Sequence, residues 1–179
     1  MSRGIYKSPA AWLLRSASEE DSGAFFDIIS ASMLYSTADF IKQYGFMPTL
    51  PESQRLREAY GIGAVFYDTR FNADTASALI YAKNKFEDNE LDSALRMMNV
   101  YKSLWEKFAF ERGGWSFMPD YVSGDRTVAS GACSLNHFLQ SAEMLYRGGA
   151  ALKNSQYKEL ALEIFGIIDA SAESWIREN

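Results

Sequence analysis

Apolar residues recur at three- and four-residue steps along most of the chain, which predicts that helices dominate the fold. Two stretches, Ala76 to Trp105 and Ser134 to Trp175, share one arrangement: an apolar-striped helix, a short polar turn and a second apolar-striped helix. Repeated α-hairpins stack into either an α-solenoid or an α/α-barrel. The pattern therefore predicts an all-α fold of stacked antiparallel α-hairpins with five to six helices, as a half α/α-toroid or a short α-solenoid.

Capping residues, glycines and prolines place the ends of these helices. We expect a single helical-hairpin domain over 1–179, in which residues 1–17 form an irregular N-terminal arm. Residues 64–71 fit either a helical turn or an extended loop, and Gly113 to Ala132 reads as one long loop. Gly148 and Gly149 are expected to end a helix. The expected helices cover residues 19–44, 52–60, 73–86, 90–111, 134–146 and 155–177, with Asn72 or Asp74 as the cap of the third.

The apolar stripes of these helices define the expected core, since the side chains at helical spacing face one side. The predicted core residues are Phe25, Ile29, Met33, Leu79, Leu95, Met98, Leu104, Leu139, Leu145, Leu162, Phe165 and Ile168.

The composition is that of an ordinary soluble protein, with 47% apolar and 23% charged residues. A net charge of -5 and the lack of a lysine and arginine run argue against nucleic-acid binding. The sequence has neither an apolar stretch of about 18 residues nor a signal-peptide pattern, so we expect no membrane span. A cytoplasmic protein fits these features, and a domain taken from a secreted parent would share them.

The chain has one cysteine, Cys133, and one histidine, His137, which excludes an intramolecular disulfide and a multi-thiolate zinc site. We expect no metal site. We also expect no cofactor, because the sequence has neither a phosphate-binding loop nor a dinucleotide fingerprint. Cys133 and His137 are four residues apart, so they could share a helix face as a catalytic dyad or form a structural pair.

Acidic and aromatic residues gather at the predicted element ends and in the two irregular segments. Paired acids are typical of glycoside-processing sites, although Asp74 can equally cap a helix and the others can be solvated. The loop aromatics suit a sugar or peptide cleft as well as a lid over the hairpin ends. The acids are Asp68, Asp74, Asp120 and Asp125, and the aromatics are Tyr67, Phe71, Trp115, Phe117 and Tyr121.

Three segments together resemble a known group of proteins. They are 113–120 (GGWSFMPD), 134–142 (SLNHFLQSA) and 157–161 (YKELA). This pattern over residues 72–176 resembles the six-hairpin (α/α-toroid) carbohydrate-active proteins, and most of all the C-terminal domain of the glucuronyl epimerases. The resemblance implies a hairpin fold and chemistry on uronic-acid residues. A full toroid needs roughly twice as many helices as this chain predicts.

Three functions remain open from the sequence. One is a carbohydrate-binding or carbohydrate-modifying domain for uronic-acid-type sugars. The others are a helical module that binds a protein partner and a structural subunit of a larger assembly. We expect a carbohydrate or a protein as the partner. We also expect a homo-oligomer or a subunit of an assembly, because a short hairpin stack leaves two open ends. The expected ligand-binding residues are Tyr67, Asp68, Arg70, Trp115, Asp120, Tyr121, Asn136 and His137.

Overall fold

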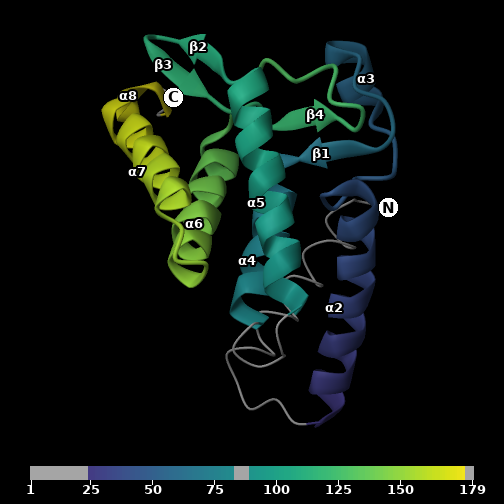
Figure 1. Cartoon of the computed structure of the whole chain (residues 1–179). Helices are drawn as coiled ribbons and strands as arrows, with labels where there is room; N and C mark the ends of the chain where they lie inside the picture. Colours follow the sequence, from purple (N-terminus) through teal and green to yellow (C-terminus); the bar gives the residue numbers. More distant parts are fainter. Residues whose placement is uncertain (1–23, 83–88, 176–179) are drawn as a thin grey trace.

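A computed structural model describes residues 24–82 and 89–175, and most of these residues are helical (Figure 1). The N-terminal arm predicted for 1–17 lies outside them. The helices are α2 (Ala24–Tyr44), α3 (Gln54–Tyr60), α4 (Thr69–Ala82), α5 (Asn89–Phe108), α6 (Leu135–Ala151), α7 (Ser155–Ala170) and the single turn α8 (Ala172–Trp175). The strands are β1 (Phe66–Asp68), β2 (Phe110–Arg112), β3 (Trp115–Phe117) and β4 (Tyr121–Ser123).

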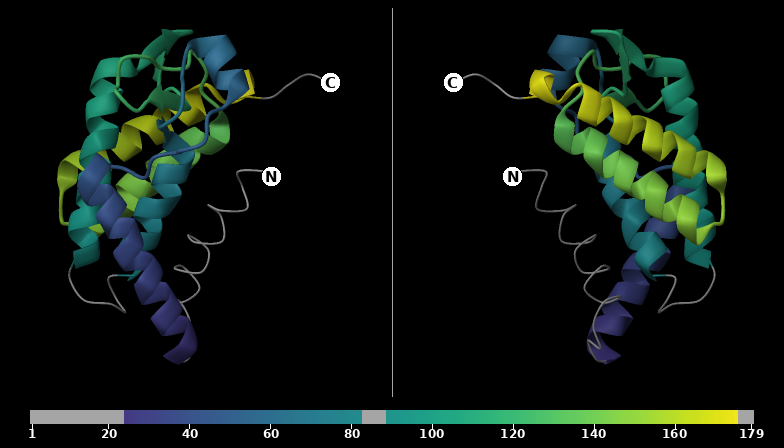
Figure 2. Two further views of the ribbon diagram at one scale, coloured as in Figure 1. Left: turned by 90° about the vertical axis from the view of Figure 1, so that its right-hand side faces the viewer. Right: turned by 90° about the vertical axis from the view of Figure 1, so that its left-hand side faces the viewer.

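Helix α4 lies at the centre of the core, between α5 and α6, and α7 folds back antiparallel on α6 (Figures 1 and 2). The helix stripes meet here, and burial of their apolar side chains is the main force that holds the layers together. The core residues without solvent exposure include Ala73, Ala76, Leu79, Ala94, Met97, Met98, Tyr101, Ala142, Leu145, Ala161 and Ile164.

The prediction of an all-α fold of stacked hairpins is wrong, because four short strands form two antiparallel sheets among the described residues. Strands β2 and β3 form a hairpin across Gly113 and Gly114, which both have positive φ values. Strands β1 and β4 pair across the fold, with Asp68 opposite Tyr121. Strands β1, β3 and β4 lie in the segments predicted as irregular, whereas β2 takes the end of the helix predicted for 90–111, which stops at Phe108. The half-toroid and solenoid descriptions therefore do not apply.

Pairing of β1 with β4 also moves the start of α4. The helix begins at Thr69 rather than near Ala73, because the Asp68 carboxylate accepts the backbone N–H of Phe71 at 2.9 Å. Asn72, one of the predicted caps, is instead buried inside the helix. Its side chain bonds to both the N–H and the carbonyl of Met47. Asp68 thus ends a strand and caps a helix, which fixes the position of its carboxylate.

Gly148 and Gly149 do not end α6, which continues to Ala151. Both glycines are buried where α6 packs against its neighbours. A methyl group on Gly148 would collide with the side-chain end of Met98, and one on Gly149 would lie 3.0 Å from the Asn154 carbonyl oxygen in the turn to α7. The glycines therefore serve close packing of helices rather than helix termination.

The core prediction is confirmed for Leu79, Met98, Leu104 and Leu145, which are fully buried, while Ile29, Met33, Leu95 and Ile168 are partly buried. It is wrong for Leu139, Leu162 and Phe165, whose side chains are exposed on α6 and α7. The α7 stripe that faces the core is Tyr157, Ala161, Ile164 and Ile167. The burial of Phe25 lies outside what the structure describes.

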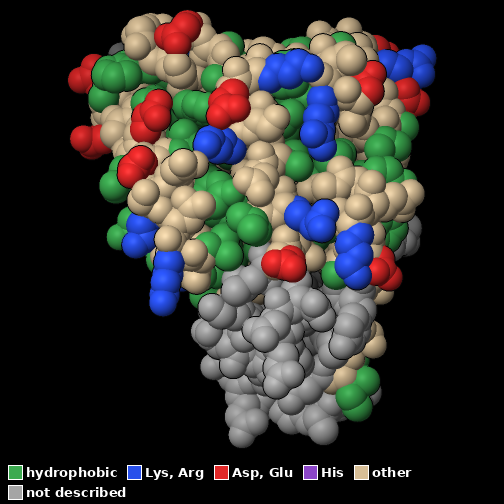
Figure 3. Space-filling model, viewed as in Figure 1, with side chains coloured by type: hydrophobic (Ala, Val, Ile, Leu, Met, Phe, Trp, Pro, Cys, Tyr) green, Lys and Arg blue, Asp and Glu red, His purple; other side chains and the backbone are tan. Residues whose placement is uncertain are grey.

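The face shown in Figure 3 mixes acidic and basic side chains without a continuous basic stripe. In the described part of the chain, no helix combines the length and the apolar character needed to cross a membrane.

Candidate functional site

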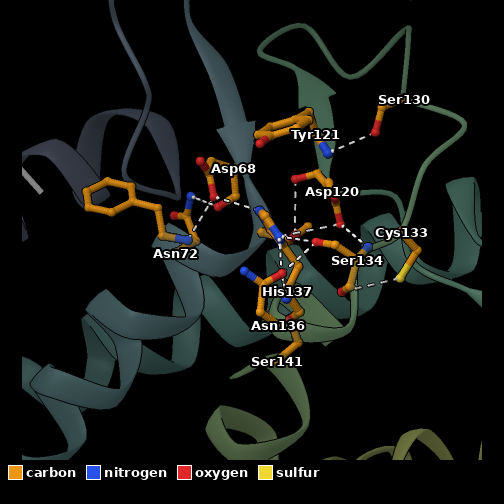
Figure 4. Close-up of polar contacts among 12 residues, drawn as sticks. Asp68, Asn72, Asp120, Tyr121, Ser130, Cys133, Ser134, Asn136, His137 and Ser141 are labelled. Atoms are coloured by element: carbon orange, nitrogen blue, oxygen red, sulfur yellow. Dashed lines mark hydrogen bonds and ion pairs between the residues drawn. The ribbon is translucent and has the colours of Figure 1, made fainter. Parts of the chain in front are cut away.

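The β1–β4 sheet and the N-terminus of α6 bring two acidic side chains and a histidine together (Figure 4). Asp68 is the last residue of β1, and Asp120 directly precedes β4. The backbone N–H and the hydroxyl of Thr69 both donate to the Asp120 carbonyl, at 3.0 and 3.1 Å, so the two acidic positions are held side by side. His137 projects from the first turn of α6 into the space between them.

The imidazole of His137 has a carboxylate at each of its nitrogens. Its Nε2 atom lies 3.6 Å from Oδ1 of Asp68, and its Nδ1 atom lies 3.6 Å from Oδ1 of Asp120. The Tyr121 ring packs edge-on against it, with centroids 5.6 Å apart. The His137 side chain is only 11% exposed. The ring is therefore held in one orientation, with acids at both of its proton-binding atoms.

Ser134 precedes α6 at the N-cap position, but its hydroxyl does not cap the helix. An N-cap serine ordinarily accepts a backbone N–H of the first helical turn. The Asn136 side-chain oxygen takes over this task at 3.0 Å from the His137 N–H. Ser134 Oγ instead lies 2.6 Å from His137 Nδ1 and 2.7 Å from Asn136 Oδ1. The serine hydroxyl is thus directed at the imidazole.

The hydrogen bonds of this group allow more than one arrangement. Ser134 has one hydroxyl proton for three possible acceptors, which are Asn136 Oδ1, His137 Nδ1 and the Asp120 carboxylate. If it donates to Asn136, Nδ1 must carry a proton and donate to Ser134 Oγ. If Nε2 carries the proton and faces Asp68, Nδ1 accepts from the serine. The cluster can therefore pass a proton between Ser134 and His137.

Burial also shapes the charge of the acids. Desolvation raises the pKa of Asp120, and this effect exceeds the opposing influence of His137 and of the Ser134 N–H, which donates to Asp120 Oδ1 at 2.8 Å. Desolvation likewise raises the pKa of Asp74, with the Arg70 charge acting against it. Acids with a raised pKa inside a cavity are typical of functional sites, because a catalytic acid or base needs a pKa that suits its task.

These groups border a cavity of about 690 Å³, which is within the usual range for small-molecule sites. Arg55 and Arg70 reach it from α3 and α4, and neither makes an ion pair within residues 24–82 and 89–175. The lining residues are Thr49, Ser53, Arg55, Leu56, Tyr60, Phe66, Asp68, Arg70, Phe71, Asp74, Asp120, Tyr121, Ala132, Ser134, Asn136 and His137.

Six of the eight residues expected to bind a ligand line this cavity: Asp68, Arg70, Asp120, Tyr121, Asn136 and His137. The other two lie elsewhere. Tyr67 is buried in the core against Phe46, because the alternation of β1 turns it away from Asp68. Trp115, on β3, lines a second cavity, of about 880 Å³.

Sequence reasoning missed Arg55 and Tyr60, and it treated Ser134 only as a helix cap. A serine followed three residues later by histidine at a helix start does carry a signal, since the two side chains can meet there. For Arg55 and Tyr60 the sequence offers no such signal, because α3 is positioned by tertiary contacts.

Cys133 and His137 do not form a dyad. The Cys133 Sγ atom contacts the Ser134 carbonyl at 3.9 Å, and burial strongly raises the pKa of the thiol. Asp125 lies outside the site, in the turn after β4, where hydrogen bonds from Ser123 and Thr127 lower its pKa. Among the described residues, no group of three His, Cys, Asp or Glu side chains is arranged to hold a metal ion.

The chain matches no protein-family model, no curated protein and no solved structure at the significance required.

Proposed function

We propose that the cavity beside His137 binds an acidic carbohydrate of the uronic-acid type and that the Asp68–His137–Asp120 cluster handles protons on it. The observation that carries this proposal is the convergence on one cavity of an imidazole flanked by carboxylates and two arginines that form no ion pair with any described residue. The resemblance of residues 72–176 to carbohydrate-active proteins points to the same ligand class.

The lining chemistry supports a sugar acid over a neutral or apolar ligand. Arg55 and Arg70 are exposed at the cavity, and their guanidinium groups offer planar, paired donors that match the geometry of a carboxylate. Tyr60 and Tyr121 border the same space and offer flat apolar faces with polar tips, which suit a sugar ring. Asn136 and the acids can bond to sugar hydroxyls.

The Asp68–His137–Asp120 cluster is suited to proton transfer. A general acid or base must lie within hydrogen-bond reach of its partner, and its pKa should be near the working pH. His137 meets the first condition through Ser134, and the raised pKa of Asp120 moves that acid toward the second.

Calorimetric titration of the full chain with D-glucuronate, and with D-glucose as the neutral match, tests the binding. We expect glucuronate to bind and glucose to bind far more weakly. Arg70→Gln should weaken glucuronate binding about 10- to 100-fold, as expected for the loss of a hydrogen bond to a charged group. Arg96→Gln, on the exposed face of α5, is the matched control and should change nothing. Equal affinity for the two sugars, or none for either, would exclude the proposal.

A helical interaction module is the second candidate, and a separate observation favours it. Helices α6 and α7 expose four large apolar side chains, Leu139, Tyr146, Leu162 and Phe165, and exposed apolar surface of this kind can bind a protein partner. If this surface binds a second copy, sedimentation should show an oligomer that the double variant Leu162→Ser, Phe165→Ser converts to a monomer. A wild-type monomer at high concentration would contradict self-association.

A further inference from the structure

Two separate cavities share Ser134 as a lining residue. The polar cavity described above lies on the side of His137, Asp68 and Asp120. The second cavity, of about 880 Å³, lies between the β2–β3 hairpin and the end of α7. Its walls include four aromatic rings, those of Phe110, Trp115, Phe117 and Trp175. Of the residues that the structure describes, Ser134 alone lines both cavities, and its neighbours Cys133 and Leu135 line only the aromatic one.

We propose that Ser134 is a nucleophile that cleaves an ester joining an aromatic acyl group to a hydroxyl of the sugar acid. This inference rests on the proposed function, because the sugar acid occupies the polar cavity. The aromatic acyl group occupies the other cavity, so the ester bond lies at the serine between them.

The contacts of Ser134 support this role. A nucleophilic serine needs a base within about 2.6–3.2 Å and a third group that orients the base. Ser134 Oγ lies 2.6 Å from Nδ1 of His137, and Asp68 lies at the opposite nitrogen of the ring. The hydroxyl makes no capping bond to α6, so attack does not disturb a helix cap. Ser134 thus has a base within hydrogen-bond distance, and the Asp68 carboxylate faces the opposite nitrogen of that base at 3.6 Å.

The helix end offers stabilisation for the oxyanion. The backbone N–H groups of Leu135 and Asn136, in the first turn of α6, have no acceptor within the helix. In serine hydrolases, the N–H of the residue after the nucleophile forms part of the oxyanion site. Leu135 holds that position here.

The reaction is then a balanced acyl transfer. Ser134 Oγ attacks the ester carbonyl carbon, and its proton passes to Nδ1 of His137. The bond between the carbonyl carbon and the sugar oxygen breaks, and His137 returns the proton to that oxygen. The sugar leaves on the side of the polar cavity, which His137 lines. Water next attacks the acyl-serine, gives a proton to His137, and the proton returns to Ser134 as the aromatic acid departs.

A cinnamoyl ester of methyl glucuronoside is the test substrate. The acetyl ester of the same glycoside, which lacks the aromatic group, is the control substrate. We expect the wild-type chain to release cinnamic acid. Ser134→Ala should slow release at least 10³-fold while retaining glucuronate binding. Ser103→Ala, on the exposed side of α5, should keep the wild-type rate. Trp115→Ala should raise the KM for the cinnamoyl ester and leave the acetyl ester unaffected.

Covalent labelling with an aryl fluorophosphonate, followed by peptide mass mapping, gives a second measurement. An adduct on Ser134, absent in His137→Ala, supports the inference. A wild-type chain that binds glucuronate but neither hydrolyses the ester nor forms the adduct would overturn it and leave the proposed function standing. An adduct on Ser134 without glucuronate binding would support the nucleophile and reject the sugar acid as the ligand. Circular dichroism of each variant checks that the fold is retained.

Discussion

Helices α6 and α7 approach each other so closely at Gly149 that replacing this residue tests the packing directly. A methyl group added there would lie 2.9 Å from Lys158 Cγ and 3.0 Å from both the Asn154 carbonyl oxygen and the Lys158 backbone nitrogen. Two of these three atoms belong to the backbone, so a side-chain rotation cannot relieve the crowding. Gly166, inside α7, is the matched control, because nothing lies within 4 Å of the added methyl group.

Both substitutions increase helix propensity, but only Gly149→Ala adds steric crowding. Alanine gains about 0.5–1 kcal/mol over glycine within a helix. Crowding a packed interior costs about 1–3 kcal/mol. For a chain of this size, 1 kcal/mol changes the Tm by about 2–4 °C. We therefore expect Gly166→Ala to raise the Tm by about 1–4 °C and Gly149→Ala to lower it.

Thermal unfolding followed by circular dichroism at neutral pH measures both variants. The difference between their free energies of unfolding gives the packing cost, because the helix-propensity gain largely cancels. A Gly149→Ala variant as stable as Gly166→Ala would refute the close helix crossing. That result would favour the sequence-based expectation that Gly148 and Gly149 end a helix.

Three further predictions address the site and the core. The raised pKa of Asp120 means that stability falls as pH rises from the ordinary carboxyl range through the folded pKa. Asp120→Asn keeps an acceptor for the Ser134 N–H, and it should therefore raise the Tm at neutral pH but not in acid. A gain in Tm that does not depend on pH would contradict desolvation of the carboxylate as the cause. Tyr67→Phe should raise stability by about 1 kcal/mol in denaturant titration, since the buried hydroxyl has no hydrogen-bond partner among the described residues. Tyr67→Phe should also leave glucuronate binding unchanged, and weaker binding would show that Tyr67 contributes to the ligand site. Leu79→Ala should cost about 2–5 kcal/mol because the side chain is fully buried. Leu162→Ala should change the free energy of unfolding by less than about 0.5 kcal/mol, because that side chain is 58% exposed. Similar losses for Leu79→Ala and Leu162→Ala would contradict the burial of Leu79 and the exposure of Leu162.

Much of the candidate site could be read from the sequence. Acids and aromatics at element ends and a lone histidine at a helix start singled out six of the residues that line the polar cavity. This worked because helix starts and loop ends are where polar side chains and free backbone groups meet. Tyr67 was misplaced because adjacent strand residues point to opposite sides, and the strand itself was not recognised.

The sequence by itself determined that the protein is mostly helical and where several helices end. Periodic apolar positions, the Asn154 cap of α7 and the Gly61 cap of α3 act within a few residues, so they operate in any tertiary context. Such local signals cannot report on partners that are distant in the chain.

Only the tertiary structure decided the sheets, the buried helix faces and the role of Ser134. The three-residue strands β1 and β4 are too short to show an alternating pattern, and each gains its stability from a partner more than 50 residues away. Which stripe of α7 is buried depends on where α6 lies, so Leu162 and Phe165 face solvent while Ile164 does not. The Ser134 hydroxyl is directed at His137 instead of the helix end, where Asn136 accepts the His137 N–H, and the β1–β4 pair places two acids around the imidazole.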